Sequence, residues 1–289
     1  MWLGKKRGHL SDWTTQLWVR STGQRVNLDL HPWLKGPIGK PTGIGSDFFH
    51  QLAVEQNLTV ETGRGLIKDF NQLKSERCHP DQVSSLVKDF YENTGRYEIE
   101  AWSEWCGWFK PFGWALARLF SRRLQQLNVP LSNLDTSQGM TSSVSNLVDR
   151  TTGTICYTAW VRQLRRSKNV LYAGSYSLCT LPGVSSACVK VVFPLPNGNA
   201  TVIMYPESSP DGSFSVTSSG LCFGEPGFYF IVSTDKGFWA KYVRAMRESI
   251  KVYPSESESV RADHVLRIWG ATFLRLHYKL MRVPASKIA

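Results

Sequence analysis

The sequence predicts an α+β protein in which a helical N-terminal region covers a large, curved antiparallel sheet. Three observations predict this class. Two apolar, β-branched runs between Val189 and Tyr205 flank Asn197-Gly198, the strongest short-range signal for a β-hairpin. Similar runs follow one another after Leu131 and are separated by turn residues. Before Pro130, in contrast, apolar residues recur at helical spacing.

The chain has 289 residues, of which 42% are hydrophobic and 12% aromatic. Such a chain can bury a sizeable core, as one large domain or as two ordinary ones. We expect residues 1–130 to form a mainly helical region that covers the sheet. We expect residues 131–289 to form the antiparallel sheet and to grip one helix, with both parts packed as one compact unit.

The first 45 residues predict little regular structure. Arg25–Leu30 alternates between apolar and polar residues and is expected to form a short edge strand. Residues 36–45 are too rich in glycine and proline for a regular element. Pro41 stands where a phosphate-binding loop carries serine or threonine, so we expect a plain loop there.

Helical spacing of apolar residues extends from Ser46 to Asn128. Ser46 is a suitable N-cap, and Pro80 fits the first turn of the strongest segment. Pro130 ends the last segment. The segments expected to be helical are Ser46–Asn57, Arg64–Leu73, Pro80–Tyr91, Tyr97–Trp105 and Pro111–Asn128.

After Leu131 the apolar spacing changes to the period of two that is typical of strands. The even spacing of the runs favours a continuous meander, which must curl to cover its own apolar face. The strands are expected at Ser143–Val148, Thr154–Leu164, Val170–Cys179, Ala187–Leu195, Ala200–Tyr205, Ser213–Ser218 and Phe228–Val232.

Two further elements complete the predicted fold. Gly237–Tyr253 is expected to form the gripped helix, because apolar residues from Trp239 to Ile250 recur three or four positions apart. Val265–Val283 is expected to form one long strand, because apolar and polar residues alternate strictly from Leu274 to Leu280.

A formal charge of +11 and a pI of about 9.5 favour anionic partners, such as nucleic acid, acidic lipid headgroups or small anions. A basic surface that serves only solubility is the alternative. The sequence has no RNA-binding strand motif, zinc knuckle or stripe dense in Lys and Arg. A nucleic-acid or protein-interaction module therefore ranks third among the candidate functions.

The sequence contains no recognisable catalytic or metal-binding motif, and we expect no cofactor. The histidines are isolated from one another, no two cysteines form a CxxC pair, and no GxSxG motif occurs. The scattered cysteines and the absence of a secretory leader indicate reduced thiols and a cytoplasmic protein, with peripheral membrane contact as a further option.

Aromatic residues recur along the predicted strands. A curled sheet leaves a concave interior, and such interiors hold apolar ligands whose polar ends tyrosine or arginine can orient. The alternative is a core that these same side chains fill. The residues expected to contact a ligand are Trp160, Tyr172, Tyr176, Phe193, Tyr205, Phe228 and Phe230.

Trp102–Arg123 combines tryptophan and phenylalanine with a basic flank, a composition typical of an element at a membrane interface. A buried aromatic cover for the sheet explains the same composition and is favoured over membrane contact. If the segment does meet a membrane, the contacting residues are expected to be Trp105, Trp108, Phe109, Lys110 and Phe112.

Six short segments between Lys88 and Val232 carry a family resemblance: Phe90–Glu92, Trp102–Trp105, Pro111–Trp114, Leu134–Thr136, Val191–Ala200 and Pro226–Phe230. Together they resemble an uncharacterised bacterial protein family. The family has no settled activity, so the resemblance implies no functional residue. The order of helices, meander and late helix is also similar to helix-grip lipid-binding domains of the START type, although a fold does not fix a function.

The leading expectation is therefore a protein that binds a hydrophobic or amphipathic, lipid-like small molecule in a cavity of the curved sheet. The second is an enzyme that acts on a small anionic or apolar substrate in the same cavity. A cluster of ionisable residues facing the cavity would distinguish the second from the first.

Overall fold

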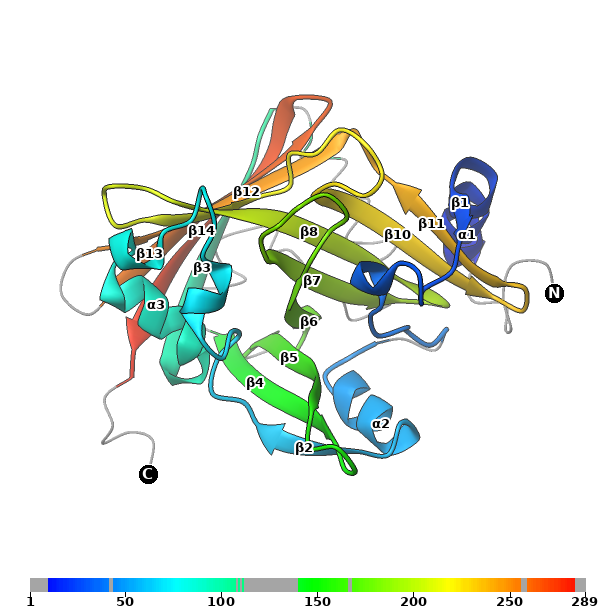
Figure 1. The fold of residues 1–289 in the computed structure, drawn as a ribbon, viewed down its shortest axis with the longest axis horizontal. Helices are drawn as coiled ribbons and strands as arrows, with labels where there is room; N and C mark the ends of the chain where they lie inside the picture. The colour runs from blue at the N-terminus through cyan, green and yellow to red at the C-terminus, as the bar shows by residue number, and fades with distance from the viewer. Residues whose placement is uncertain are drawn as a thin grey trace.

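The structure is a computed structural model that describes residues 10–41, 44–107, 109, 111, 140–165, 168–255 and 259–283. Within these residues an antiparallel sheet of fourteen strands dominates the molecule, and three α-helices accompany it (Figure 1). The α+β class is confirmed.

The helices are α1 (Leu10–Thr22), α2 (Phe48–Glu55) and α3 (Ser85–Glu92). The first seven strands are β1 (Gln24–Val26), β2 (Leu58–Thr62), β3 (Tyr97–Trp105), β4 (Met140–Asp149), β5 (Ile155–Leu164), β6 (Val170–Cys179) and β7 (Cys188–Leu195). The next seven are β8 (Gly198–Ser208), β9 (Phe214–Thr217), β10 (Gly227–Thr234), β11 (Gly237–Tyr242), β12 (Met246–Pro254), β13 (Ser259–Ile268) and β14 (Ala271–Arg282).

The main path of the sheet runs β2-β4-β5-β6-β7-β8-β9-β12-β13-β14-β3. The sheet curls so far that β3, at one end of this path, comes to lie near β4 at the other. An ion pair of 3.4 Å between Arg165, just after β5, and Glu98 of β3 spans the two ends. The curl gives the sheet an inner face, toward the enclosed space, and an outer face.

The sheet branches at β8. One edge of β8 pairs with β7, while the other pairs first with β10 and then with β9. β10 continues to β11, which pairs with β1. The residues Gly198–Met204 of β8 are all buried, because both faces of the strand are covered. This explains why the apolar run there is continuous instead of alternating.

The three helices lie at separate places on the sheet and do not form one layer. α1 packs against β10 and β11, α2 against β2, and α3 against β12 and β13 (Figure 1). The region 1–130 also supplies β1, β2 and β3 to the sheet. A continuous helical cover is therefore not what the described residues form. The helix expected at Pro111–Asn128 lies outside them beyond Pro111.

The helix predicted at Gly237–Tyr253 is wrong, because this segment forms β11 and most of β12. In β12 the side chains with even residue numbers face the inside of the curled sheet, and they include Met246, Glu248 and Ile250. The glutamate interrupts the apolar alternation and thereby hides the period of two. The sheet consequently grips no helix at this position, and the likeness to helix-grip domains loses its main element.

The segment Tyr97–Trp105 was also expected to be helical and is instead strand β3. It buries Tyr97, Ile99 and Ala101 in strict alternation. Trp102 is exposed on the opposite face, and its spacing from Ile99 and Trp105 produced the helical interpretation.

Other boundaries differ less. The seven predicted strands from Ser143 to Val232 correspond to β4–β10, and the helix at Ser46–Asn57 corresponds to α2. The helix predicted at Arg64–Leu73 is only a short 3₁₀ turn at Phe70–Leu73. The long strand predicted at Val265–Val283 is a hairpin of β13 and β14. Helix α1 was not predicted.

The β7–β8 hairpin is confirmed, but its turn is centred one residue earlier than predicted. Leu195 pairs with Gly198, so the loop is Pro196-Asn197, and Asn197 has a φ of 56°. A proline followed by a residue of positive φ is the pattern of a type II turn. Gly198 starts β8, where a Cβ would lie 2.0 Å from the carbonyl oxygen of Ile231 on β10. Glycine is thus required there for close strand approach.

The outer face is densely packed. Four rings from the N-terminal segment, the loop before β10, β10 itself and β11 form an outer aromatic cluster, consisting of Trp33, Phe223, Tyr229 and Tyr242. Elsewhere on the outer face Phe49 and Leu52 of α2 pack against Ala159 and Ala173 of the sheet. The segment around Trp33 and helix α2 therefore fill these parts of the outer face.

Candidate ligand-binding cavity

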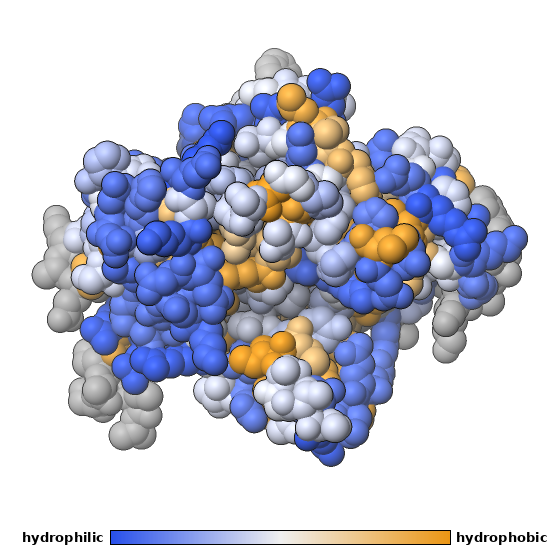
Figure 2. Space-filling model, in the orientation of Figure 1, coloured by the Kyte–Doolittle hydropathy of each residue, from blue (hydrophilic) through white to orange (hydrophobic). Residues whose placement is uncertain are grey.

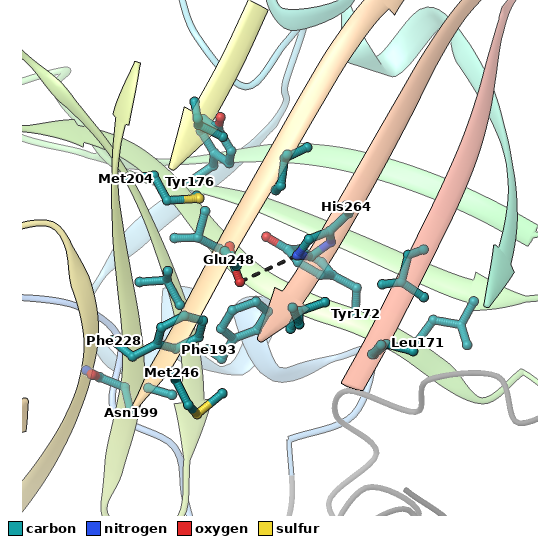
Figure 3. Close-up of a pocket in the computed structure, with 18 of the residues that line it drawn as sticks. Leu171, Tyr172, Tyr176, Phe193, Asn199, Met204, Phe228, Met246, Glu248 and His264 are labelled. Carbon is teal, nitrogen blue, oxygen red and sulfur yellow. Dashed lines mark ion pairs between the residues drawn. The ribbon is translucent and has the colours of Figure 1, made fainter. Parts of the chain in front are cut away.

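The curled sheet encloses a cavity of about 1100 Å³. One wall is built from β5, β6, β7, β8 and β10, and the facing wall from β12, β13 and β14 (Figure 3). Helices α1 and α3 each add lining residues. Part of the inner face therefore borders a hollow, whereas residues around α3 pack against the rest of that face.

Most side chains that line the cavity are aliphatic or aromatic. On β8 they include Ala200, Val202 and Met204, and on β10 Phe228 and Phe230. These residues alternate along their strands because successive side chains point to opposite faces of a sheet. In Figure 2 apolar residues show through near the middle of the molecule, while the surface around α3 is hydrophilic.

Three rings on neighbouring strands form an inner aromatic row, consisting of Trp160 on β5, Tyr172 on β6 and Phe193 on β7. Their ring centroids are 5.2 Å and 5.1 Å apart, with edge-to-face geometry. Tyr172 lies over Gly174, where a Cβ would meet the end of the tyrosine side chain at 3.1 Å. The glycine leaves room for this ring orientation.

The guanidinium of Arg162 lies among the rings of this row. Its central carbon is 4.4 Å from the ring centroids of both Trp160 and Tyr172. It is also 5.5 Å from the ring of Tyr278, which comes from β14 on the facing wall. Cation–π contacts of this kind stabilise a cation away from bulk water. Arg162 therefore places a fixed positive charge at the cavity wall.

Glu248 and His264 lie on the facing wall. His264 Nε2 is 3.5 Å from a carboxylate oxygen of Glu248, and the side chains are 15% and 9% exposed respectively (Figure 3). His264 pairs with Ile250 in the β12–β13 ladder, so Glu248 is its diagonal neighbour on the same face. The two side chains form the second charged part of the cavity.

Three tyrosines of the cavity are held in the neutral form by burial. Burial raises the pKa of Tyr91, Tyr172 and Tyr176 above the ordinary value, because a phenolate would lose its hydration. The charge of Glu248 raises the pKa of Tyr172 further, whereas Arg162 lowers it. These phenols can therefore donate hydrogen bonds to a ligand, and a hydrogen bond already joins Tyr91 and Tyr176.

A second polar region lies where α1 meets the cavity. Asp12 and Gln16 of α1 line it and are 5% and 3% exposed. The Gln16 amide donates a hydrogen bond of 3.2 Å to the carbonyl of Pro196 in the β7–β8 turn. This contact ties α1 to the rim of the sheet.

The structure brings six of the seven residues expected to contact a ligand to one cavity. These are Trp160, Tyr172, Tyr176, Phe193, Phe228 and Phe230. Tyr205 instead faces outward, where its hydroxyl is 3.1 Å from that of Ser186 and its ring lies under Arg77. Contact with a ligand stays a prediction for the six.

Of the five residues expected at a membrane interface, Trp105 and Phe109 also line the cavity. Their rings lie near that of Phe273 on β14. The other three, Trp108, Lys110 and Phe112, lie outside the described residues.

Sequence reasoning missed the charged residues of the cavity, namely Arg162, Glu248 and His264. The sequence singles out neither Arg162 nor Glu248, and His264 is one of several histidines that are isolated from one another. Glu248 could have been found if β12 had been recognised as a strand, because it then occupies an inward position between Met246 and Ile250. No local signal connects strands so far apart in the chain.

The described residues contain no group of three or more His, Cys, Asp or Glu side chains placed to hold a metal ion. All six cysteines are free thiols; Cys179 and Cys188 are direct cross-strand neighbours. None of the helices in the described ranges is long and apolar enough to cross a membrane.

A curated relative from Bacillus subtilis (strain 168), named "Uncharacterized membrane protein YndJ", is 25% identical to this chain over 242 residues. The match covers 83% of this chain and 42% of the relative, so the chain spans about two-fifths of the relative's length. No family model and no solved structure matches the chain. The resemblance to an uncharacterised bacterial protein is confirmed, and the relative's name states no activity.

Proposed function

We propose that this protein binds a hydrophobic or amphipathic small molecule in the cavity of its curved sheet. The observation that supports this most strongly is a hollow of about 1100 Å³ whose lining is mainly aliphatic and aromatic. Ligand cavities are typically roughly 300–1,000 Å³ and combine such a lining with a few polar groups. Arg162, Glu248 and His264 are among the polar groups here.

The size of the apolar lining is sufficient to hold a lipid-like chain. Each methylene group that leaves water contributes about 0.8 kcal/mol, so about ten methylenes contribute roughly 8 kcal/mol. That value corresponds to a Kd of about 1 μM before the entropic cost of association is subtracted. Contacts to the polar groups can offset part of this cost.

The proposal includes contact between the open side of the cavity and a membrane surface. Trp269 lines the cavity and is 82% exposed at the tip of the β13–β14 hairpin. The φ of Trp269 is 48°, and that of Gly270 is 84°. Asn-Gly is the dipeptide that most readily adopts two consecutive positive φ angles in a hairpin turn. A bulky residue at positive φ is strained, and such strain is common at functional positions. Tryptophan is favoured at membrane interfaces.

Replacement of Trp269 by Asn tests this contact, because asparagine tolerates the positive φ and removes the indole. We expect Trp269→Asn to weaken association with vesicles of acidic lipid and to leave the fold as stable as before or more stable, by about 1 kcal/mol. Trp102→Asn, at another exposed tryptophan on the sheet, is the matched control and should bind vesicles normally. Unchanged vesicle association of Trp269→Asn would count against membrane contact through this hairpin.

An enzyme acting on a small substrate in the same cavity is the second candidate. The observation that favours it is the pair of Glu248 and His264, since a histidine beside a carboxylate can accept and return a proton. Among the described residues no serine or cysteine lines the cavity. The wall therefore offers a proton carrier without either of these nucleophiles.

The ligand itself distinguishes the two candidates. Lipid incubated with the protein and then analysed by mass spectrometry should be recovered unchanged if the protein only binds it. A new product that the wild type forms and His264→Ala does not form would favour the enzyme.

The main proposal is tested by mass spectrometry of the organic extract of the purified protein and by uptake of a fluorescent lipid. Ile250→Trp places a large ring in the cavity, whereas Arg247→Trp places the same ring on the exposed face of the same strand. We expect Ile250→Trp to reduce uptake strongly and Arg247→Trp to retain it. An extract without any amphiphile, together with no uptake by the wild type, would contradict the proposal.

A further inference from the structure

The guanidinium of Arg162 lies among aromatic rings, and its buried Nε has no hydrogen-bond acceptor among the described residues. The rings of Trp160, Tyr172 and Tyr278 surround it at 4.4, 4.4 and 5.5 Å. Cation–π contacts stabilise the charge of a guanidinium but supply no oxygen acceptor for its N–H groups. A buried donor without an acceptor costs free energy, which a ligand oxygen can restore.

A second buried nitrogen without a hydrogen bond lies on the facing wall of the same cavity. Nε2 of His264 is buried and forms no hydrogen bond among the described residues, although Glu248 lies 3.5 Å away. His264 is opposite Leu276 in the β13–β14 ladder, which places Tyr278 as its diagonal neighbour. The ring that contacts Arg162 thus also borders the histidine.

The charges in this part of the cavity come from three side chains on three strands. Arg162 is positive and Glu248 is negative, and protonation of His264 adds a second positive charge. Burial raises the pKa of the neighbouring Tyr172, so its phenol adds no negative charge near neutral pH. With His264 protonated, Arg162, Glu248 and His264 together carry a net charge of +1. One monoanion neutralises it, whereas a phosphate dianion would leave a negative excess.

We propose that the cavity binds an amphiphile whose head group is a single carboxylate. Arg162 binds this carboxylate through in-plane N–H groups. His264 donates a second hydrogen bond to the same carboxylate. The proposal rests on the proposed binding function and names the chemical class of its ligand. Guanidinium and carboxylate match in geometry and form charge-assisted hydrogen bonds. The apolar chain of the ligand then occupies the hollow beyond the inner aromatic row.

The test compares a fluorescent fatty acid with a fatty alcohol that has the same chain and fluorophore. A hydrogen bond between charged groups contributes more free energy than one to a neutral group. We therefore expect the wild type to bind the acid about tenfold or more tightly than the alcohol. Arg162→Met keeps a long apolar side chain and removes the charge. We expect it to bind the acid no more tightly than the alcohol, with alcohol binding changed by less than about threefold.

Arg165→Met is the matched control, since Arg165 lies just after the same strand, is exposed and contacts Glu98. It should keep the wild-type preference for the acid. Retained alcohol binding by Arg162→Met also shows that this variant is folded. Equal binding of acid and alcohol by the wild type, or a preference that survives in Arg162→Met, would overturn the head-group assignment alone. If the wild type binds neither probe, the proposed function fails as well.

Discussion

The two faces of the sheet bury similar side chains and pack them differently. In the outer aromatic cluster each ring contacts others at centroid distances of 5.0 to 5.6 Å, and the N-terminal segment closes over them. In the inner aromatic row the rings are 5.1 and 5.2 Å apart, yet they border a hollow of about 1100 Å³. Ring spacing alone therefore does not reveal whether a face is filled.

The difference shows what decides whether a sheet face becomes core or cavity. The outer face is covered by segments that supply large side chains of their own, such as Trp33 and Leu34. One end of the inner face is also filled, because residues 66–91 pack there against Tyr176 and Phe214. Over the rest of the inner face the sheet faces itself, and its curvature holds the walls apart. Where no further segment fills the space between the two walls, a wide curved sheet leaves a hollow. The cavity is thus a consequence of topology.

The largest expected effect is at the filled face. Tyr229 is fully buried in the outer aromatic cluster, and its hydroxyl bonds the backbone of Gly224 and Glu225. Tyr229→Ala should lower the free energy of unfolding by about 3–5 kcal/mol, because it leaves a void in packed surroundings. Chemical denaturation measures this value. A loss below about 1 kcal/mol would mean that the outer cluster is not the packed core described here.

A smaller effect is expected for the same kind of change at the hollow face. Phe193 is only partly buried and borders the cavity, so its truncation enlarges a space that already exists. Phe193→Ala should cost about 1–2 kcal/mol, because the ring has packing partners on one side only. Equilibrium unfolding of the two variants side by side gives the comparison. An equal loss for both would indicate that the inner face is filled too.

The smallest effect on stability at neutral pH is expected from the ionisation of the buried tyrosines. Burial raises the pKa of Tyr242 to about 12 and raises that of Tyr229 still further. Because both pKa values are raised on folding, the stability linked to them is complete below pH 10 and is lost as the pH rises toward 12. We expect alkaline unfolding to begin only above pH 10.

Tyrosinate absorbance, recorded together with circular dichroism, follows this titration. A bound apolar ligand should delay the ionisation of Tyr172, which lines the cavity, and should leave Tyr242 of the outer cluster unaffected. Ionisation of most tyrosines near pH 10 in the folded protein would contradict the burial described here.

Much of this fold could be predicted from the sequence where alternation is clean. Strands β4 to β10 are apolar at every second position or throughout, and turn residues mark their ends. The interpretation failed at β12, because the cavity places Glu248 where a packed core would require an apolar side chain. The polar residue that concealed the strand is thus one of the residues that define the candidate site.

The candidate site was partly predictable for the same reason. Phe228 and Phe230 share one face of β10, so their common direction follows from the period of two. Tyr205 belongs to the opposite parity of β8 from Val202 and Met204, and this parity would have excluded it from the cavity. The meeting of Arg162 with Tyr278 depends on how far the sheet curls, which no local pattern specifies.

A crystal structure determined under xenon pressure tests the hollow inner face most directly, because xenon enters apolar cavities that water leaves empty. The account predicts xenon between the inner aromatic row and Ile250 of β12, or an amphiphile that already occupies this space. An inner face closed by direct contact between Phe193 and Ile250, with neither xenon nor ligand present, would contradict it.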